Sequence, residues 1–263
     1  MKNLSSWLTK REFLKFFARV AVALGIFQLP FGYAKAQKEK AKALKVKPPE
    51  NYPPEEGCYL RGDDLSPVAV AVLLPFPYGT DPPKVEAIPP EIEKLVKMAI
   101  ETGAALSGTL QTENIGIEKI ICNIVANPNI RYLVLCGNEV EGHLTGNAVI
   151  ALFKNGVNEK RTIVGAKGAR PYLFNIPPVS VERFREQVTL VNLFGVVDPG
   201  TIEKAVWSCR QEKPIKFLDY TLSDPGVYPK PAISKKLELK VPKPYTIEEF
   251  ELEDIVRELE KKK

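Results

Sequence analysis

Two apolar runs dominate the hydrophobic pattern of the chain. Residues 68–74 (Val-Ala-Val-Ala-Val-Leu-Leu) lie between Pro67 and Pro75, and residues 130–136 form a similar run after Pro128. Runs of this length, bounded by prolines and without regular polar alternation, are typical of strands buried on both faces. They predict two neighbouring strands at the centre of a sheet.

Apolar residues at helical spacing fill the segments between and after these runs. Pro90 opens a predicted helix over residues 90–102, Asn114 caps a second helix that stops at Pro128, and a third spans residues 143–154. The alternation continues with a helix over residues 180–187, a strand over residues 188–194 and a helix over residues 200–211. This alternation predicts the α/β class, as a Rossmann-like three-layer sandwich with a mainly parallel central sheet.

Changes in composition mark the ends of this pattern. Residues 57–212 are predicted to form one α/β domain, which follows a lysine- and proline-rich linker over residues 37–56. Residues 213–263 are predicted to be a proline-rich appendage, in which residues 235–241 alternate like an edge strand and Thr246 caps a charged C-terminal helix. The chemistry is therefore expected within residues 57–212.

The first 36 residues carry the whole formal net charge of +5, because they hold six basic residues and one acidic residue. The rest of the chain is balanced and offers no basic footprint for nucleic acid. The N-terminal order of basic residues, an apolar stretch over residues 20–31 and the small residues of Ala34-Lys35-Ala36 is typical of a secretory signal. Residues 9–15 resemble the twin-arginine signal, with Lys10 in place of the first arginine.

This segment predicts an extracytoplasmic or membrane-associated protein. Its apolar stretch is shorter than the roughly 20 residues of a comfortable transmembrane helix, although an uncleaved signal could still tether the chain to a membrane. The alternatives are an amphipathic N-terminal helix and a location at the cytoplasmic face.

The four cysteines are not spaced for a metal or redox motif. Cys58, Cys122, Cys136 and Cys209 form no CxxC pair and no cluster of thiolates for an iron–sulfur cubane. Cys122 and Cys136 lie in apolar runs and are expected to be buried. A disulfide remains open for an exported protein.

The loop after the second apolar run holds the single histidine of the chain. His143 follows Gly137 and Gly142, which allow backbone conformations that are closed to other residues. Ligands of α/β sheets bind at the carboxyl ends of strands, and imidazole is a strong ligand for transition metals. A lone histidine at a helix start is nevertheless more often a cap or a packed core residue.

The spacing Glu141-x-His143-x-x-Gly146 is similar to the Asp-x-His-x-x-Gly of cobamide-binding flavodoxin-like domains. On this pattern Glu141 would accept the second N–H of the imidazole and raise its basicity. Gly146 would leave space for a large flat ligand against the helix.

A longer resemblance runs in order through much of the predicted domain. It is carried by residues 57–72, 112–119, 127–131, 136–139, 142–146, 155–156, 163–169 and 181–185. On these segments the chain resembles the A subunit of the tetrahydromethanopterin:coenzyme M methyltransferase.

The resemblance implies a cobamide held on an α/β domain, with His143 as the axial ligand of cobalt. The cobalt, as Co(I), would accept a methyl group from methyl-tetrahydromethanopterin and pass it to coenzyme M with partner subunits present. It also implies ten further residues around the cofactor: Thr112, Glu113, Asn114, Gly137, Glu139, Gly142, Gly146, Gly165, Lys167 and Gly168. From the residues alone, 112–114 fit a plain helix cap equally well, and 165–168 an ordinary turn.

Two features depart from that family. Residues 246–263 are too charged for the family's C-terminal membrane anchor, and an export signal is predicted at the other end. The methyl donor and acceptor therefore stay open. Two other readings stand beside a methyltransferase function: an exported carrier, store or redox module for a cobamide, and a structural relict with an empty pocket.

Cell fractionation tests the predicted export. The mature chain should be found outside the cytoplasm and begin near Gln37, and changing Lys10 and Arg11 together to alanine should retain it inside, because the export route reads this basic pair. Recovery of the unaltered chain in the cytosol with an intact N-terminus would refute the prediction.

Overall fold

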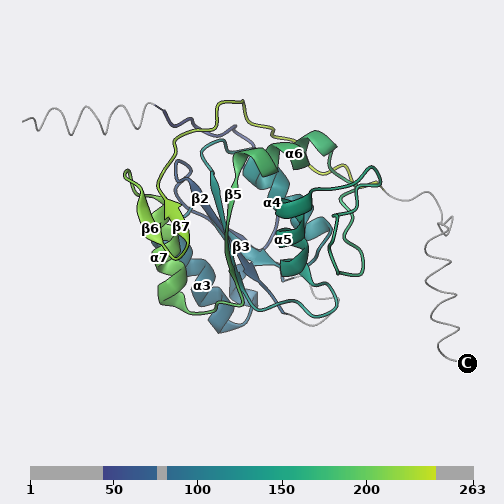
Figure 1. Cartoon of the computed structure of the whole chain (residues 1–263), viewed down its shortest axis with the longest axis horizontal. Coiled ribbons are helices and arrows are strands. Elements are labelled where there is room, and N and C mark those ends of the chain that lie inside the picture. The colour runs from purple at the N-terminus through teal and green to yellow at the C-terminus, as the bar shows by residue number, and fades with distance from the viewer. Residues whose placement is uncertain (1–43, 76–81, 241–263) are drawn as a thin grey trace, which may run out of the picture. The chain divides into compact units, whose positions relative to one another are not determined.

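The computed structural model describes residues 44–75 and 82–240, and the described residues from Val46 onward belong to one compact unit. A five-stranded sheet lies at its centre (Figure 1). The strands are β1 (Tyr59–Arg61), β2 (Val68–Leu73), β3 (Leu106–Leu110), β4 (Tyr132–Gly137) and β5 (Thr189–Phe194). Their order is β1-β3-β2-β4-β5; β2 to β5 run parallel, and β1 is antiparallel to β3. The two strands predicted to be neighbours are adjacent, as β2 and β4.

Helices cover both faces of the sheet (Figure 1). One face carries α4 (Ile115–Val125), α5 (Thr145–Asn155) and α6 (Pro178–Gln187). The other carries α3 (Pro90–Glu101), α7 (Pro199–Cys209) and the hairpin of β6 (Ile215–Phe217) and β7 (Tyr220–Leu222); a short 3-10 turn, η1 (Val85–Ala87), precedes α3. The predicted three-layer α/β sandwich with a mainly parallel sheet is confirmed.

The strand order creates a switch point between β2 and β4. From β2 the chain crosses to β3 on one side, whereas β4 and β5 lie on the other side. The register aligns the carboxyl ends of the strands, since Leu73 pairs with Leu110 and Gly137 pairs with Phe194. Open α/β sheets bind ligands at this kind of position.

Gly137 lets the chain leave β4 at the switch point. Its φ is +95°, and a Cβ at this position would lie 3.0 Å from both the backbone nitrogen and the backbone oxygen of Leu73. Any side chain would therefore be strained and would push β4 away from β2.

The two faces of β2 differ in the size of their side chains. Ala69 and Ala71 belong to the core beneath α4, α5 and α6, whereas Val70 and Val72 belong to the core beneath α3 and α7. All six residues of the strand are buried, as the continuous apolar run predicts. The small alanines leave space on the α4 side of the sheet.

Side-chain hydrogen bonds close the outer edge of β5. The backbone nitrogen of Asn192 donates to the Tyr220 hydroxyl at 2.9 Å, and that of Phe194 donates to Asn192 Oδ1 at 3.1 Å. Two outward-facing N–H groups of this edge strand are thus occupied from within the chain.

Segments on both sides of the predicted domain pack against it. Tyr52 is only 3% exposed, and Leu237 donates its backbone N–H to Glu55 Oε1 at 2.5 Å. Ile233 donates its backbone N–H to the carbonyl of Val125 at the end of α4. The described part of the predicted linker, from residue 46, therefore belongs to the compact unit.

Some predicted elements need correction or lie outside the described ranges. Residues 235–240 form no strand, so the predicted edge strand is wrong there. α5 begins at Thr145 rather than His143, because Leu144 has a left-handed backbone (φ +46°). The predicted signal over residues 1–36 and the helix after Thr246 lie outside the described residues. Within the described ranges, no helix has the length and apolar character to cross a membrane.

Replacing Leu135, which is fully buried in β4, with alanine should remove about 2–5 kcal/mol from the free energy of unfolding. The reason is that the rigid sheet cannot close the void that the lost side chain leaves behind. The matched change Val179→Ala, at a 57% exposed position on α6, should stay within about 0.5 kcal/mol. Denaturant unfolding measures both; similar losses for the two variants would contradict this account of the core.

Candidate functional site

The side chains of His143 and Glu113 meet at the carboxyl edge of the sheet. His143 lies in the turn between β4 and α5, and Glu113 lies in the connection between β3 and α4. Glu113 Oε2 is hydrogen-bonded to His143 Nδ1. The histidine side chain is 17% exposed, whereas that of Glu113 is 1% exposed. The fold thus joins two residues that are 30 positions apart in the chain.

A backbone contact fixes the second oxygen of the Glu113 carboxylate. Glu113 Oε1 accepts a hydrogen bond from the backbone nitrogen of Arg170 at 2.8 Å. A buried carboxylate needs such partners, and the two bonds orient it toward the imidazole. The sequence pattern predicts that Glu141 accepts a hydrogen bond from the imidazole of His143. In the structure Glu141 is exposed, and Glu113 makes the hydrogen bond with Nδ1 of the ring.

Glu139 caps the start of α5 with both of its carboxylate oxygens. Oε1 accepts from the backbone nitrogens of Val140 at 2.9 Å and Gly146 at 2.7 Å, and Oε2 accepts from that of Asn147 at 2.9 Å. A negative charge is favourable at a helix N-terminus. Glu139 therefore holds the turn that contains His143 against the helix.

Thr112 and Asn114 cap α4 in a similar way. Thr112 Oγ1 accepts from the backbone nitrogen of Gly116 at 2.9 Å, and Asn114 Oδ1 accepts from that of Ile115 at 2.7 Å. Both residues also line the cavity described below. The cap geometry expected from the residues alone is present, and it lies at the candidate site.

The predicted glycines have different surroundings. Gly142 and Gly165 have positive φ values of +79° and +82°. A Cβ on Gly146 would lie 2.5 Å from the ring of Phe194, so this space is filled by the protein and is not open to a ligand. The expectation that Gly146 leaves room for a flat ligand is therefore wrong for this structure.

Gly168 packs directly on the histidine turn. A Cβ there would lie 2.2 Å from the carbonyl oxygen of His143 and 3.0 Å from Cγ of Glu113. The neighbouring Lys167 donates its backbone N–H to Asn147 Oδ1 at 2.9 Å. Of the predicted residues 165–168, Gly168 therefore packs directly against Glu113 and His143.

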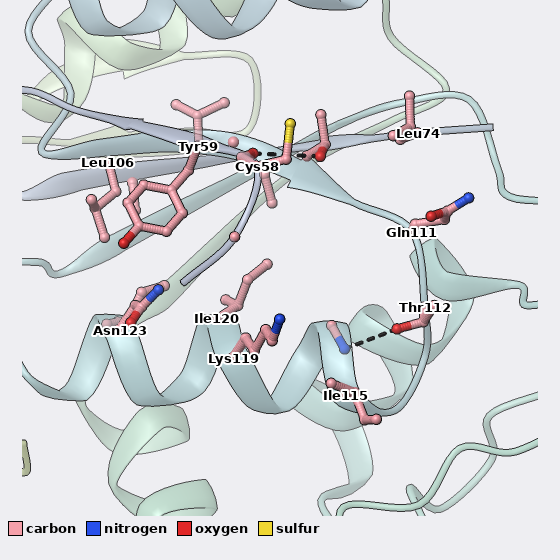
Figure 2. Close-up of a pocket in the computed structure, with 18 of the residues that line it drawn as sticks. Cys58, Tyr59, Leu74, Leu106, Gln111, Thr112, Ile115, Lys119, Ile120 and Asn123 are labelled. Carbon is pink, nitrogen blue, oxygen red and sulfur yellow. Dashed lines mark hydrogen bonds between the residues drawn. The ribbon is translucent and has the colours of Figure 1, made fainter. Parts of the chain in front are cut away.

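A cavity of about 460 Å³ lies between the sheet and α4, and His143 is part of its lining. Figure 2 shows α4 on one side, with Lys119 and Ile120, and the sheet with Tyr59 and Leu106 on the other. The lining is largely apolar, and among the described residues its charged side chains are those of Lys119 and Glu56. The cavity has the size of a small-molecule or cofactor site.

The cavity follows from small residues on one face of the sheet. Ala69, Ala71 and Gly108 lie on its sheet side. Gly108 has no room for a side chain, because a Cβ would lie 2.4 Å from Cβ of Tyr59. Tyr59 and the three residues before it also line the cavity.

The sequence pattern does not identify several residues of the site. Lys119 lies inside a segment of family resemblance, but nothing in that segment marks it as part of a cavity. Asn147, Arg170 and Phe194 give no local signal, because their contacts are made across the fold.

The cysteines take no part in this arrangement. Cys122 and Cys136 are buried, as expected, and burial raises the pKa of each thiol to about 12. All four cysteines are free thiols. The described residues contain no group of three or more histidine, cysteine and acidic side chains that could hold a metal ion.

Comparison with known proteins gives a consistent family match. The family model for MtrA, the A subunit of tetrahydromethanopterin S-methyltransferase, matches residues 79–222. The chain is 44% identical to form 1 of this A subunit from Methanothermobacter marburgensis over 174 residues, which is 66% of each protein. It is 36% identical over 207 residues to the A subunit from Methanosphaera stadtmanae, which is 78% of this chain and 70% of the relative. The chain therefore spans just under two thirds of the first relative's length.

Gly168→Ala should disturb the histidine turn, because the new Cβ would collide with the backbone oxygen of His143. We expect a loss of about 1–3 kcal/mol in the free energy of unfolding and a shift in the NMR signals of the single imidazole ring. Gly200→Ala on α7 is the control, since its new Cβ would lie 3.6 Å from the nearest neighbouring atom. Unchanged ring signals in Gly168→Ala would disprove the tight packing.

Proposed function

The chain belongs to the MtrA family of tetrahydromethanopterin S-methyltransferase subunits, and on that premise we propose that it binds a cobamide with His143 as the axial ligand of cobalt. The observation that carries the proposal is the bond between Glu113 and His143 at the switch point of the sheet, beside a cavity of cofactor size. The cobamide would supply a cobalt centre that accepts a methyl group and passes it on.

The hydrogen bond to Glu113 supports ligation through the other ring nitrogen of His143. With Nδ1 directed to the carboxylate, the cobalt would bind at Nε2, the other ring nitrogen. A carboxylate that accepts the N–H of a ligating histidine fixes the ring orientation and raises its basicity. Because the corrin ring itself would hold the cobalt, the protein would need to supply only one ligand, which we propose is His143.

The cavity offers space for the nucleotide part of the cobamide on the histidine side of the corrin. Its sheet side is apolar and flat at Ala69, Ala71 and Gly108, which suits an aromatic base. The lining holds one positive charge, on Lys119, and one negative charge, on Glu56; Lys119 would bind the phosphate diester of the nucleotide. The residues of this chain would thus bind and orient the cofactor.

The proposal extends to an assembly of this chain with other subunits. The relatives are named as subunits of a methyltransferase, and we propose that this chain also works with partner subunits that supply the methyl donor and the methyl acceptor. The twin-arginine-like residues 9–15 favour a second candidate, an exported carrier, store or redox module for a cobamide. Methyl transfer to an acceptor in the presence of co-purified partners would favour the methyltransferase subunit, and its absence would favour the carrier, store or redox module.

Reconstitution with hydroxocobalamin tests His143 directly. After reduction to Co(II), the bound cofactor should show hyperfine splitting from one axial nitrogen, which should change from three lines to two when histidine is labelled with ¹⁵N. Because the chain has one histidine, the label reports on His143 alone. His143→Ala, prepared with the same label, should lose the two-line pattern, because any nitrogen that still binds the cobalt is then the unlabelled base of the cofactor itself.

Glu141→Gln is the matched control, because Glu141 is exposed two positions away and the structure gives its predicted role to Glu113. This variant should keep the native spectrum. Cobinamide, which lacks the nucleotide, should bind more weakly than cobalamin if the cavity holds the nucleotide. Identical spectra for the native protein and His143→Ala, both prepared with ¹⁵N-histidine, would refute axial ligation. Equal affinity for the two corrinoids would refute the use of the cavity.

A further inference from the structure

A loop over residues 164–170, here called the clamp loop, is fastened to both ends of α5 by asparagine side chains. Asn147, in the first turn of the helix, accepts the backbone N–H of Lys167 through Oδ1 at 2.9 Å. Asn155, the last residue of the helix, donates its Nδ2 to the carbonyl of Val164 at 2.7 Å. The loop is thus fastened along one helix at two points, and Ala166 between them packs against the core.

The same loop forms the wall behind the candidate cobalt ligand. Gly168 packs on the carbonyl of His143, and the backbone nitrogen of Arg170 donates to Glu113. Lys167, which Asn147 holds, lies next to Gly168 and three residues before Arg170. A displacement of the loop at Lys167 would therefore reach both the histidine turn and the carboxylate.

The backbone of Asn147 is also bonded to the turn that contains His143. Its backbone nitrogen donates to Glu139 Oε2 at 2.9 Å, and Glu139 bonds in addition to Val140 and Gly146. One residue thus connects the capped start of α5, through its backbone, with the clamp loop, through its side chain.

We propose that Asn147 is a positioning residue, which holds the clamp loop so that Glu113 and His143 keep one fixed arrangement. The role of that arrangement in cobalt ligation rests on the proposed function, whereas the clamp itself exists in the protein without cofactor. Asn147 does not line the cavity, and it acts on the histidine through the backbone of Lys167 to Arg170.

Hydrogen exchange and NMR test the clamp on the full chain without cofactor. In Asn147→Leu the backbone amides of Lys167 and Arg170 should exchange about tenfold faster, because a hydrogen bond of the loop is lost. The ring signals of the single histidine should broaden or double, because the imidazole samples more than one arrangement. Asn147→Asp, which keeps an acceptor oxygen at the same position, should restore the native exchange rates and signals.

Asn51→Leu provides the control, because Asn51 also bonds through its side-chain oxygen at the surface, to the hydroxyl of Ser234, but does not contact the clamp loop. It should leave the histidine signals unchanged. If Asn147→Leu does not fold, Asn147→Ser, whose shorter side chain cannot span to Lys167, replaces it. Native exchange rates and a single native set of ring signals in the folded variant would overturn the proposal.

Titration with hydroxocobalamin separates this inference from the proposed function. Asn147→Leu should bind about tenfold more weakly than the native protein, which corresponds to about 1.4 kcal/mol, and its axial nitrogen splitting should be less well resolved. If the native protein binds no corrinoid, the proposed function fails while the exchange data still decide the clamp. If corrinoid binds equally to both proteins while the loop exchanges faster, the positioning role is refuted.

Discussion

The contact between Glu113 and His143 is the constraint around which the carboxyl edge of this sheet is arranged. A carboxylate that is almost wholly buried is costly unless its oxygens find partners. Its two partners come from separate segments, the turn after β4 and the backbone at Arg170. The connection after β3, the start of α5 and the clamp loop must therefore all be in place before this acid is satisfied. The parallel register meets this requirement by ending β3 and β4 at the same edge.

The unequal sizes of side chains on the two faces of β2 give the site its depth. Valines fill the face under α3 and α7, whereas Ala69 and Ala71 leave space for a cavity under α4. This asymmetry costs packing on one face, since empty space in a core removes dispersion contacts. The core on the opposite face supports the sheet, while the face beneath α4 contains the cavity in addition to its own core.

The elements with a strong local signal could be predicted from the sequence, whereas the contacts across the fold could not. The apolar runs of β2 and β4 identify the central strands, but β3 has the sequence Leu-Ser-Gly-Thr-Leu and gives no such run. His143 is identifiable as the single histidine in a glycine-bounded loop. The spacing pattern assigns its partner wrongly to Glu141, because the position of Glu113 depends on the order of the strands, which short spacing does not reveal.

Gly146 illustrates the same limit. Its small size indicates a close approach, but the approaching group is Phe194 from a strand almost fifty residues later. Phe194 can only be placed there once the pairing of β4 with β5 is known. Local spacing therefore locates the loop of interest, whereas tertiary structure decides what each of its residues touches.

The closed edge of β5 has a consequence for how this protein can meet other chains. An exposed strand edge normally offers main-chain groups to any extended peptide, which is one route to assembly and to aggregation. At Asn192 and Phe194 those groups are already engaged by Tyr220 and by the side chain of Asn192. A protein that approaches this side of the molecule cannot continue the sheet there. Recognition at this edge must instead depend on the shape and chemistry of side chains, which allows selection among partners.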